Sequence, residues 1–198
     1  MRPRKLQKRG QQSVAESDFQ TELGRGFDGL VGCHWHKIAD MPHFLAKQAK
    51  VTLKKPYDCY ALHFSLFCGI ELKQPNGMSL RTQSPNSSGL SVEQEACLLA
   101  VEQNGGVGLV VANFLVALSP KESKARGGLA VYDRSWATTM SQLKAARKEC
   151  AADAIPLKWW EANAVELPAC KVDGKAAWDP RPMLTMAREW RMATPWGA

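Results

Sequence analysis

The chain has 198 residues, of which 45% are hydrophobic, and this size and composition fit one globular domain with a sizeable core. Lysine and arginine outnumber aspartate and glutamate by 26 to 19, and the resulting net charge of +7 favours a polyanionic partner, nucleic acid first and an anionic membrane second. No apolar run approaches the ~20 residues that a membrane-spanning helix needs, which excludes that class.

The first twelve residues are basic and poor in core residues. We predict a flexible arm over residues 1–12 and a single domain over 13–198. The arm lacks the apolar segment of a secretion signal, so we expect an intracellular protein. Six cysteines occur without any C-x-x-C pair, which indicates reduced thiols with structural roles.

The first predicted elements are a helix over residues 17–27 and a short strand over 33–38. Ser17 is placed to cap the helix, and the apolar residues that follow it recur at helical spacing. Those residues are Phe19, Leu23 and Phe27. A segment rich in lysine then leads to position 55.

Residues 56–73, PYDCYALHFSLFCGIELK, are the most informative stretch. Their aromatic and β-branched content predicts two strands joined in a hairpin, with the turn at 63–65. A long polar loop over 74–90 follows, and loops of this length inside compact domains are often functional. Ser91 then caps a helix that ends at Asn104.

The rest of the chain is predicted to alternate strands and helices. The run over 106–118 is almost wholly apolar and predicts a buried strand. A strand over 129–132 and a helix over about 135–150 come next. From about 155 the chain is rich in tryptophan and proline, and this extension either wraps the core or forms an interface. The order of elements predicts an α/β fold with a mixed central sheet flanked by helices.

Three residues of the predicted hairpin can converge on one site. Glu71 and Lys73 are two apart on a strand, so both side chains leave the same face. Asp58 lies on the preceding strand, and a hairpin can bring it beside Glu71. Two carboxylates can bind Mg²⁺, which polarises a phosphoryl oxygen and helps to ionise water. A neighbouring lysine can stabilise charge on the phosphorus, so the set suits phosphodiester hydrolysis.

An E-x-K pair alone is very common and usually marks an ordinary surface strand. The context here changes that interpretation. Pro56 and Asp58 enter the hairpin just upstream, and Ile70 and Leu72 flank Glu71 with apolar neighbours. Together with the basic charge and the following helix, this pattern favours a nuclease.

These residues resemble the PD-(D/E)XK motif of a superfamily of nucleases. More closely, residues 17–135 resemble the RecU family of Holliday junction resolvases, also called penicillin-binding protein-related factor A. The resemblance includes the YD…IELK hairpin, the long polar loop and the GGVGLVV strand. It implies a restriction-endonuclease-like core with the order αβββαβ.

The resemblance also implies roles for single residues. The hairpin carboxylates of the family bind Mg²⁺, which maps to Asp58 and Glu71, and Mn²⁺ is expected to substitute. The lysine of the motif stabilises the transition state, which maps to Lys73. A glutamine on the following helix belongs to the metal site, which maps to Gln94.

Three further residues are candidates by resemblance or position. Glu22 on the first helix matches a glutamate that related nucleases place near the metals, and a solvent-facing helical residue is about equally compatible with the sequence. Lys37 resembles a basic strand residue that contacts phosphate. Arg81 lies in the long loop and is a candidate for DNA contact.

The chain also departs from the family in several places. Pro56 stands where the family has a threonine, and the segment between Lys37 and Asp58, which carries the family's projecting stalk, is shorter. The loop before Gln94 is longer, and the tail beyond Ser135 matches no family motif. These differences bear on junction specificity more than on phosphodiester cleavage.

The resemblance implies a metal-dependent, structure-selective DNA endonuclease, with a Holliday junction resolvase as the first expectation. Its partner would be branched DNA, chiefly a four-way junction, and the two-fold symmetry of such junctions calls for a homodimer. No membrane partner is expected. Such an enzyme of DNA recombination and repair would suit the cytoplasm of a bacterium or a phage-infected cell.

Three alternatives remain open. The first is another PD-(D/E)XK nuclease that acts on flaps or plain duplex. The second is a non-catalytic DNA-binding protein on the same fold, against which the intact set of Asp58, Glu71 and Lys73 argues. The third is a partner-binding protein that uses the C-terminal tryptophans, for which core packing is the plainer explanation.

Overall fold

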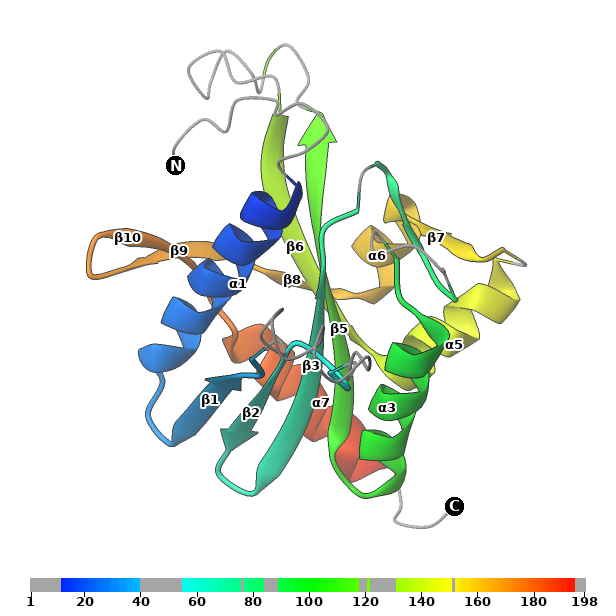
Figure 1. Cartoon of the computed structure of the whole chain (residues 1–198), viewed down its shortest axis with the longest axis horizontal. Helices are drawn as coiled ribbons and strands as arrows, with labels where there is room; N and C mark the ends of the chain where they lie inside the picture. The colour runs from blue at the N-terminus through cyan, green and yellow to red at the C-terminus, as the bar shows by residue number, and fades with distance from the viewer. Residues whose placement is uncertain are drawn as a thin grey trace, which may run out of the picture.

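The computed structural model describes residues 12–39, 55–75, 77–83, 89–117, 121, 131–150 and 152–194. Within these ranges the chain is a mixed α/β fold around a six-stranded sheet of order β1-β2-β3-β5-β6-β8 (Figure 1). Strands β3 and β5 run parallel, and the other neighbours in this sheet run antiparallel. The coarser prediction of an α/β fold with a mixed central sheet is confirmed.

The bounds of the elements are as follows. The central sheet consists of β1 (Cys33–Lys37), β2 (Cys59–His63), β3 (Leu66–Lys73), β5 (Val107–Ala117), β6 (Val131–Thr139) and β8 (Val165–Leu167). Two small sheets pair β4 (Ser79–Arg81) with β7 (Ala154–Pro156) and β9 (Ala169–Val172) with β10 (Lys175–Trp178). The helices are α1 (Gln12–Asp28), α3 (Val92–Gln103), α5 (Met140–Glu149), α6 (Leu157–Asn163) and α7 (Arg181–Ala193).

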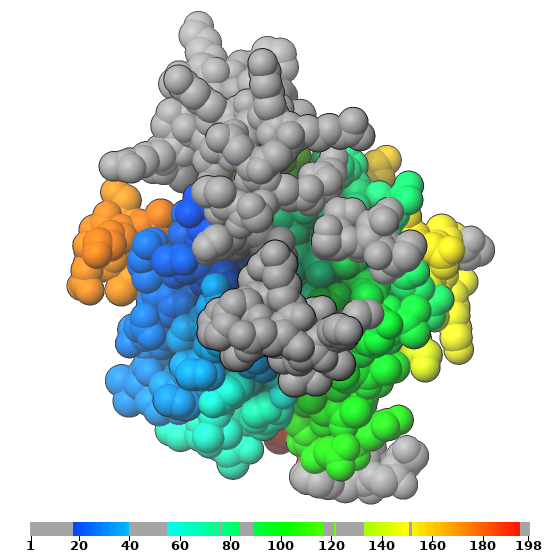
Figure 2. Space-filling model, in the orientation of Figure 1, coloured from blue at the N-terminus to red at the C-terminus, as the bar shows by residue number. Residues whose placement is uncertain are grey.

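The sheet separates two apolar clusters. Helices α1 and α7 pack on the face that carries Ile70 and Leu72 of β3. Helices α3, α5 and α6 pack on the other face, against Val110 and Ala112 of β5. Figure 2 shows α1 packed beside the first strands, with the β9–β10 hairpin projecting at one edge. Side chains that alternate along β3 therefore meet different helices.

The hairpin and the helix after the polar loop form as the sequence predicts. Strands β2 and β3 pair antiparallel, with the turn at Phe64 and Ser65. Ser91 caps α3, because its hydroxyl accepts from the Gln94 N–H while the Gln94 side chain accepts from the Ser91 N–H. This capping box fixes the direction in which Gln94 leaves the helix.

Two predicted boundaries are wrong. Helix α1 begins at Gln12, so Ser17 lies inside it rather than at its cap, and Gln12 belongs to the helix rather than to the arm. Residues 135–139 continue β6 instead of starting a helix, because they pair with β5 along a buried ladder. The helix begins only at Met140, where Thr139 supplies the N-cap.

The C-terminal extension is part of the packed core. Strand β8 pairs with β6, and Trp160 and Trp178 are buried. These tryptophans are therefore core residues, as the plainer interpretation holds, whereas Trp196 lies outside the described residues.

Most of the predicted arm, the lysine-rich segment over 40–54 and part of the polar loop also lie outside the described residues. All six cysteines are free thiols, and no helix of the described part is long and apolar enough to cross a membrane.

Gly108 allows α3 to lie close to β5. A Cβ atom at this position would meet the Leu98 carbonyl oxygen of α3 at 2.5 Å. Gly108→Ala is therefore expected to lower the free energy of unfolding by about 1–3 kcal/mol, the usual cost of overpacking. Urea denaturation measures this, with Gly77→Ala as the control because a Cβ there meets nothing within 4 Å. Equal stability of the two variants would show that α3 does not need this close approach.

Candidate active site

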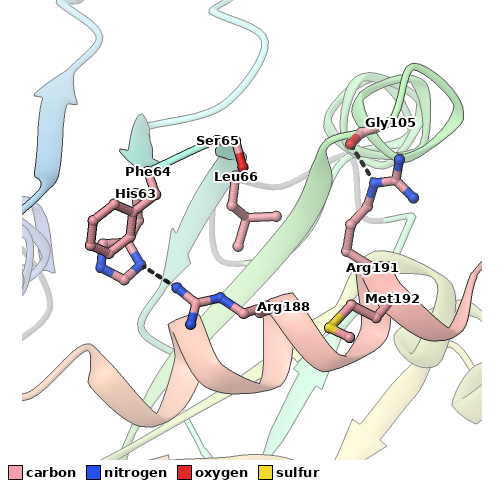
Figure 3. A pocket seen from close by; sticks show the side chains of 8 residues that line it. All are labelled: His63, Phe64, Ser65, Leu66, Gly105, Arg188, Arg191 and Met192. Atoms are coloured by element: carbon pink, nitrogen blue, oxygen red, sulfur yellow. Dashed lines mark hydrogen bonds between the residues drawn. The ribbon is translucent and has the colours of Figure 1, made fainter.

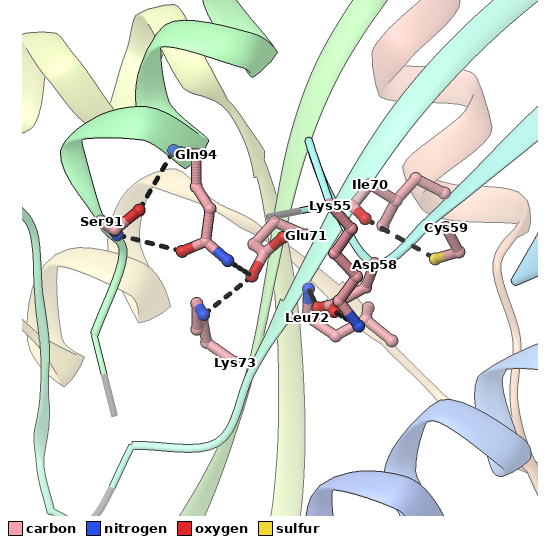
Figure 4. A network of polar contacts seen from close by, with 9 residues as sticks. All are labelled: Lys55, Asp58, Cys59, Ile70, Glu71, Leu72, Lys73, Ser91 and Gln94. Carbon is pink, nitrogen blue, oxygen red and sulfur yellow. Dashed lines mark hydrogen bonds and ion pairs between the residues drawn. The ribbon is translucent and has the colours of Figure 1, made fainter. Parts of the chain in front are cut away.

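The carboxyl group of Glu71 and the ammonium group of Lys73 are in direct contact in the buried part of β3. The Lys73 ammonium Nζ lies 2.7 Å from Glu71 Oε1, and the two residues are only 1% and 5% exposed (Figure 4). Their parallel register partners on β5 are Val110 and Ala112, so both side chains lie on the face covered by α3. An acidic and a basic group thus share a site from which water is largely excluded.

Gln94 reaches this pair from α3. Its amide Nε2 donates to Glu71 Oε1 at 2.5 Å, while its amide oxygen accepts from the Ser91 N–H at 3.0 Å (Figure 4). The structure therefore brings Gln94 to the site that the resemblance implies. In this conformation the amide donates to the carboxylate and holds it in place, and the role of Gln94 as a metal ligand stays a prediction.

Asp58 lies directly before β2 and beside Glu71 along the hairpin, because Cys59 pairs with Ile70. Its Oδ2 accepts from the Leu72 N–H at 2.8 Å. Strand β2 begins only at Cys59, opposite Ile70, so the Asp58 side chain takes the place of a backbone acceptor from β2 at Leu72. Asp58 is buried, and its charge raises the pKa of Glu71. The two predicted carboxylates are therefore brought together.

Lys55 is a member of the site that the sequence interpretation missed. Its Nζ lies 2.8 Å from Asp58 Oδ1 (Figure 4). The spacing of three residues between a lysine and an aspartate at the entry to the strand was the available signal. Four charged side chains, two acidic and two basic, thus meet where β2 begins and β3 ends.

The Glu71 carboxyl is strongly perturbed. Burial, reinforced by the charge of Asp58, raises its pKa from 4.5 to about 8, against the opposing effect of Lys73. Among the described groups Glu71 Oε2 is also a buried oxygen without a hydrogen-bond partner. In the absence of a bound cation this group therefore destabilises the fold as the pH rises from 4.5 to about 8, because the unfolded chain releases its proton first.

The other predicted residues lie apart from this cluster. Glu22 accepts from Trp178 Nε1 at 3.1 Å, and its helix packs on the opposite face of the sheet. Lys37 pairs with Cys59, on the face away from Glu71, and is exposed. Arg81 is exposed on β4, which pairs with β7 rather than with the central sheet. Their proposed roles in catalysis and DNA contact stay predictions.

The residues of the cluster suit a hard divalent cation. Two neighbouring carboxylates, one with a buried and unpartnered oxygen, form an oxygen donor set that a cation would neutralise. Within the described residues no group of three histidine, cysteine, aspartate or glutamate side chains is placed to hold a metal. A cation here would therefore have two carboxylate ligands and complete its shell with water or substrate, as Mg²⁺ commonly does.

Comparison with known proteins gives no family: no family model and no curated protein matches the chain. The functional argument therefore depends on the residues of the site and on their geometry.

Proposed function

We propose that this chain is a Mg²⁺-dependent DNA endonuclease that hydrolyses backbone phosphodiesters at Asp58, Glu71 and Lys73. The observation that carries the proposal is the buried cluster itself. Two carboxylates and a lysine ammonium, 2.7 Å from one of them, converge on one site of a basic protein. Burial of charged side chains costs desolvation free energy, so a buried cluster of this kind is more readily explained by a functional role than by stability. Carboxyl groups with perturbed pKa values are typical of catalytic sites.

The arrangement of elements supports the same proposal. The short strand β4 lies between β3 and α3 and belongs to a separate small sheet. Without it, the order α1, β1, β2, β3, α3, β5 corresponds to the αβββαβ core of restriction-endonuclease-like nucleases. Asp58 lies directly before the second strand, Glu71 and Lys73 lie on the third, and Gln94 lies on the helix α3. We propose this nuclease core as the finer class of the fold.

Each residue then has a chemical role. Asp58 and Glu71 hold the cation, and Gln94 fixes the orientation of the Glu71 carboxylate. A bound cation supplies Lewis acidity at the phosphoryl oxygen and lowers the pKa of water. Lys73 places a positive charge beside the reacting phosphate, where negative charge grows in the transition state. Lys55 neutralises Asp58 and can turn to a DNA phosphate once that carboxylate has another cation.

The choice of DNA substrate rests on the resemblance to the RecU family. We propose a four-way junction cut by a homodimer, because two cuts related by two-fold symmetry need two identical sites. The net charge of +7 supports sequence-independent contacts to phosphates. Cytoplasmic activity on branched DNA during recombination and repair would follow from this substrate.

A panel of labelled substrates tests the proposal. The full chain is incubated in Mg²⁺ with a four-way junction, a flap and a linear duplex of matched sequence. Paired, symmetric cuts in the junction are expected. Faster cleavage of the flap or duplex would assign a different nuclease specificity to the same site, and binding without cleavage of any substrate would overturn the enzymatic proposal.

Metal binding is expected to release a proton. Because the pKa of Glu71 is about 8, its carboxyl is mostly protonated at pH 7 and must ionise to bind a cation. Calorimetry in buffers of different ionisation enthalpy should show close to one proton released at pH 7 and little at pH 9. Affinity for Mg²⁺ should rise about tenfold per pH unit up to about pH 8. An affinity that does not change over this range would remove Glu71 from the ligand set.

A further inference from the structure

A row of planar side chains crosses the edge of the central sheet, on the face that carries Glu71. Strands β1 and β2 form this edge (Figure 1). Cys59 and Ala61 of β2 are buried in the cluster beneath α1, so Tyr60 between them points to the other face. Phe67 of β3 lies four residues before Glu71 and therefore leaves the strand on the same face as that carboxyl.

Strand β1 adds two histidines to this row. Trp35 stacks on Phe27 of α1, with the ring centroids 5.3 Å apart. His34 and His36, on either side of Trp35, therefore point away from α1. Both histidines are exposed, so their rings are open to a ligand.

The four rings adjoin one another across the three strands. The ring centroid of Tyr60 lies 6.5 Å from that of His34, 5.5 Å from that of His36 and 5.8 Å from that of Phe67. The rings of Tyr60 and Phe67 are inclined by only 28° and are stacked. We call His34, His36, Tyr60 and Phe67 the aromatic face.

The aromatic face extends to the candidate active site. Gly69 lies between Phe67 and Glu71 on β3, and it pairs with Tyr60 of β2. A Cβ atom at Gly69 would meet the Tyr57 ring at 3.2 Å, so the missing side chain leaves room for a further aromatic ring. Glu71 follows Gly69 by two residues, or ~7 Å along the strand. A base on the aromatic face would therefore belong to the strand beside the scissile phosphate.

The charge and chemistry of this face suit a nucleic-acid strand. Strands β1 and β2, which the structure describes in full, contain no acidic residue, and Glu71 is the one acidic residue of β3. A phosphate backbone along these strands thus meets no like charge before the proposed cation site. Imidazole and phenol rings combine a π face with groups that hydrogen-bond, which fits a base better than an apolar protein surface.

We propose that the aromatic face binds unpaired nucleotides of the DNA strand that is cut at Glu71. Aromatic side chains stack on any base, because every base has a π face, but the bases of a duplex are already stacked on one another. The enzyme would therefore select DNA with unpaired bases beside the scissile bond, such as a flap or a junction with an open centre. The position of the cut rests on the proposed nuclease function, whereas binding of the unpaired strand does not.

Fluorescence anisotropy with the full chain in EDTA tests binding without cleavage. The probes are a labelled oligothymidylate and a blunt duplex of the same length. The double variant His34→Ala/His36→Ala and the single variant Tyr60→Leu should each bind oligothymidylate about tenfold or more weakly than the wild type. Affinity for the duplex should stay unchanged. Tyr60→Phe keeps the ring and should bind oligothymidylate like the wild type.

His63→Ala is the matched control. His63 lies on the same hairpin but points to the opposite face, where its Nδ1 lies 3.4 Å from Nη2 of Arg188 on α7 (Figure 3). This variant should bind both probes like the wild type. If the wild type does not bind oligothymidylate, or if the aromatic-face variants bind it as His63→Ala does, the proposal is overturned and the rings only stabilise the sheet.

Cleavage in Mg²⁺ then tests the selection of substrate. Two four-way junctions are compared, one fully paired and one with unpaired thymidines at the exchange point. The wild type should cut the second faster, and His34→Ala/His36→Ala should lose this preference. Equal rates on the two junctions would overturn the selection. Ring-dependent binding of oligothymidylate without cleavage of any substrate would instead retain the single-strand site and overturn the nuclease function alone.

Discussion

Lys73→Ala is expected to lower the rate of junction cleavage by ~10²–10³ while the affinity for the junction stays close to that of the wild type. Lys73 is only 5% exposed, and its ammonium is directed at Glu71 rather than at solvent. Its charge therefore matters most when negative charge grows on the transferring phosphate. A cleavage time course and a gel shift on the same junction separate the two effects.

The Lys73 variants should fold. With a pKa of about 8, Glu71 can remain protonated at neutral pH when its basic neighbour is lost. Lys73→Met keeps the aliphatic bulk of the side chain and should show the same loss of rate. Lys144→Ala, an exposed residue on α5, is the control. Cleavage by Lys73→Ala at the rate of the Lys144→Ala control would show that the E-x-K pair is structural.

Asp58→Asn is expected to abolish detectable cleavage and to weaken Mg²⁺ binding by more than ~100-fold, since loss of an outer-shell partner alone costs 10–100-fold. The asparagine oxygen can still accept from the Leu72 N–H, so the start of the hairpin should survive. Removal of one negative charge near the phosphates should leave DNA affinity unchanged or slightly higher. Mg²⁺ titration by calorimetry and a cleavage assay measure the two effects.

Asp173→Asn provides the matched control. Asp173 is exposed in the β9–β10 turn with φ of 49°, a conformation that asparagine also tolerates. This variant should bind Mg²⁺ and cleave DNA like the wild type. Wild-type cleavage by Asp58→Asn would remove Asp58 from the metal site, whereas a lower melting temperature in both variants would point to stability instead.

The sequence contains enough local information to predict the centre of the fold. The β2–β3 hairpin follows from a short alternating and aromatic stretch, and α3 follows from the Ser91 cap. Both signals act over a few residues. Glu71 and Lys73 share a face because a strand has a period of two, so their proximity could be predicted without knowledge of the remaining sheet.

Features that depend on distant contacts could not be predicted in the same way. Residues 135–139 become a strand because β5 offers a buried partner 22 or more positions away, which local propensity does not reveal. The orientation of the Gln94 amide depends on Ser91 on one side and on Glu71 on the other. The contact between Arg188 of α7 and His63 at the end of β2 likewise joins segments separated by more than a hundred residues.

The most direct test of the nuclease assignment is the cleavage of a labelled four-way junction through a cycle of metal removal and restoration. The full-length protein is assayed in Mg²⁺, then in excess EDTA, and again after Mg²⁺ is restored, with Glu71→Gln in parallel. We predict cleavage in Mg²⁺, none in EDTA, full recovery on restoration, and no cleavage by the variant under any condition. Cleavage that persists in EDTA, or that Glu71→Gln retains, would contradict a metal-dependent nuclease centred on Glu71.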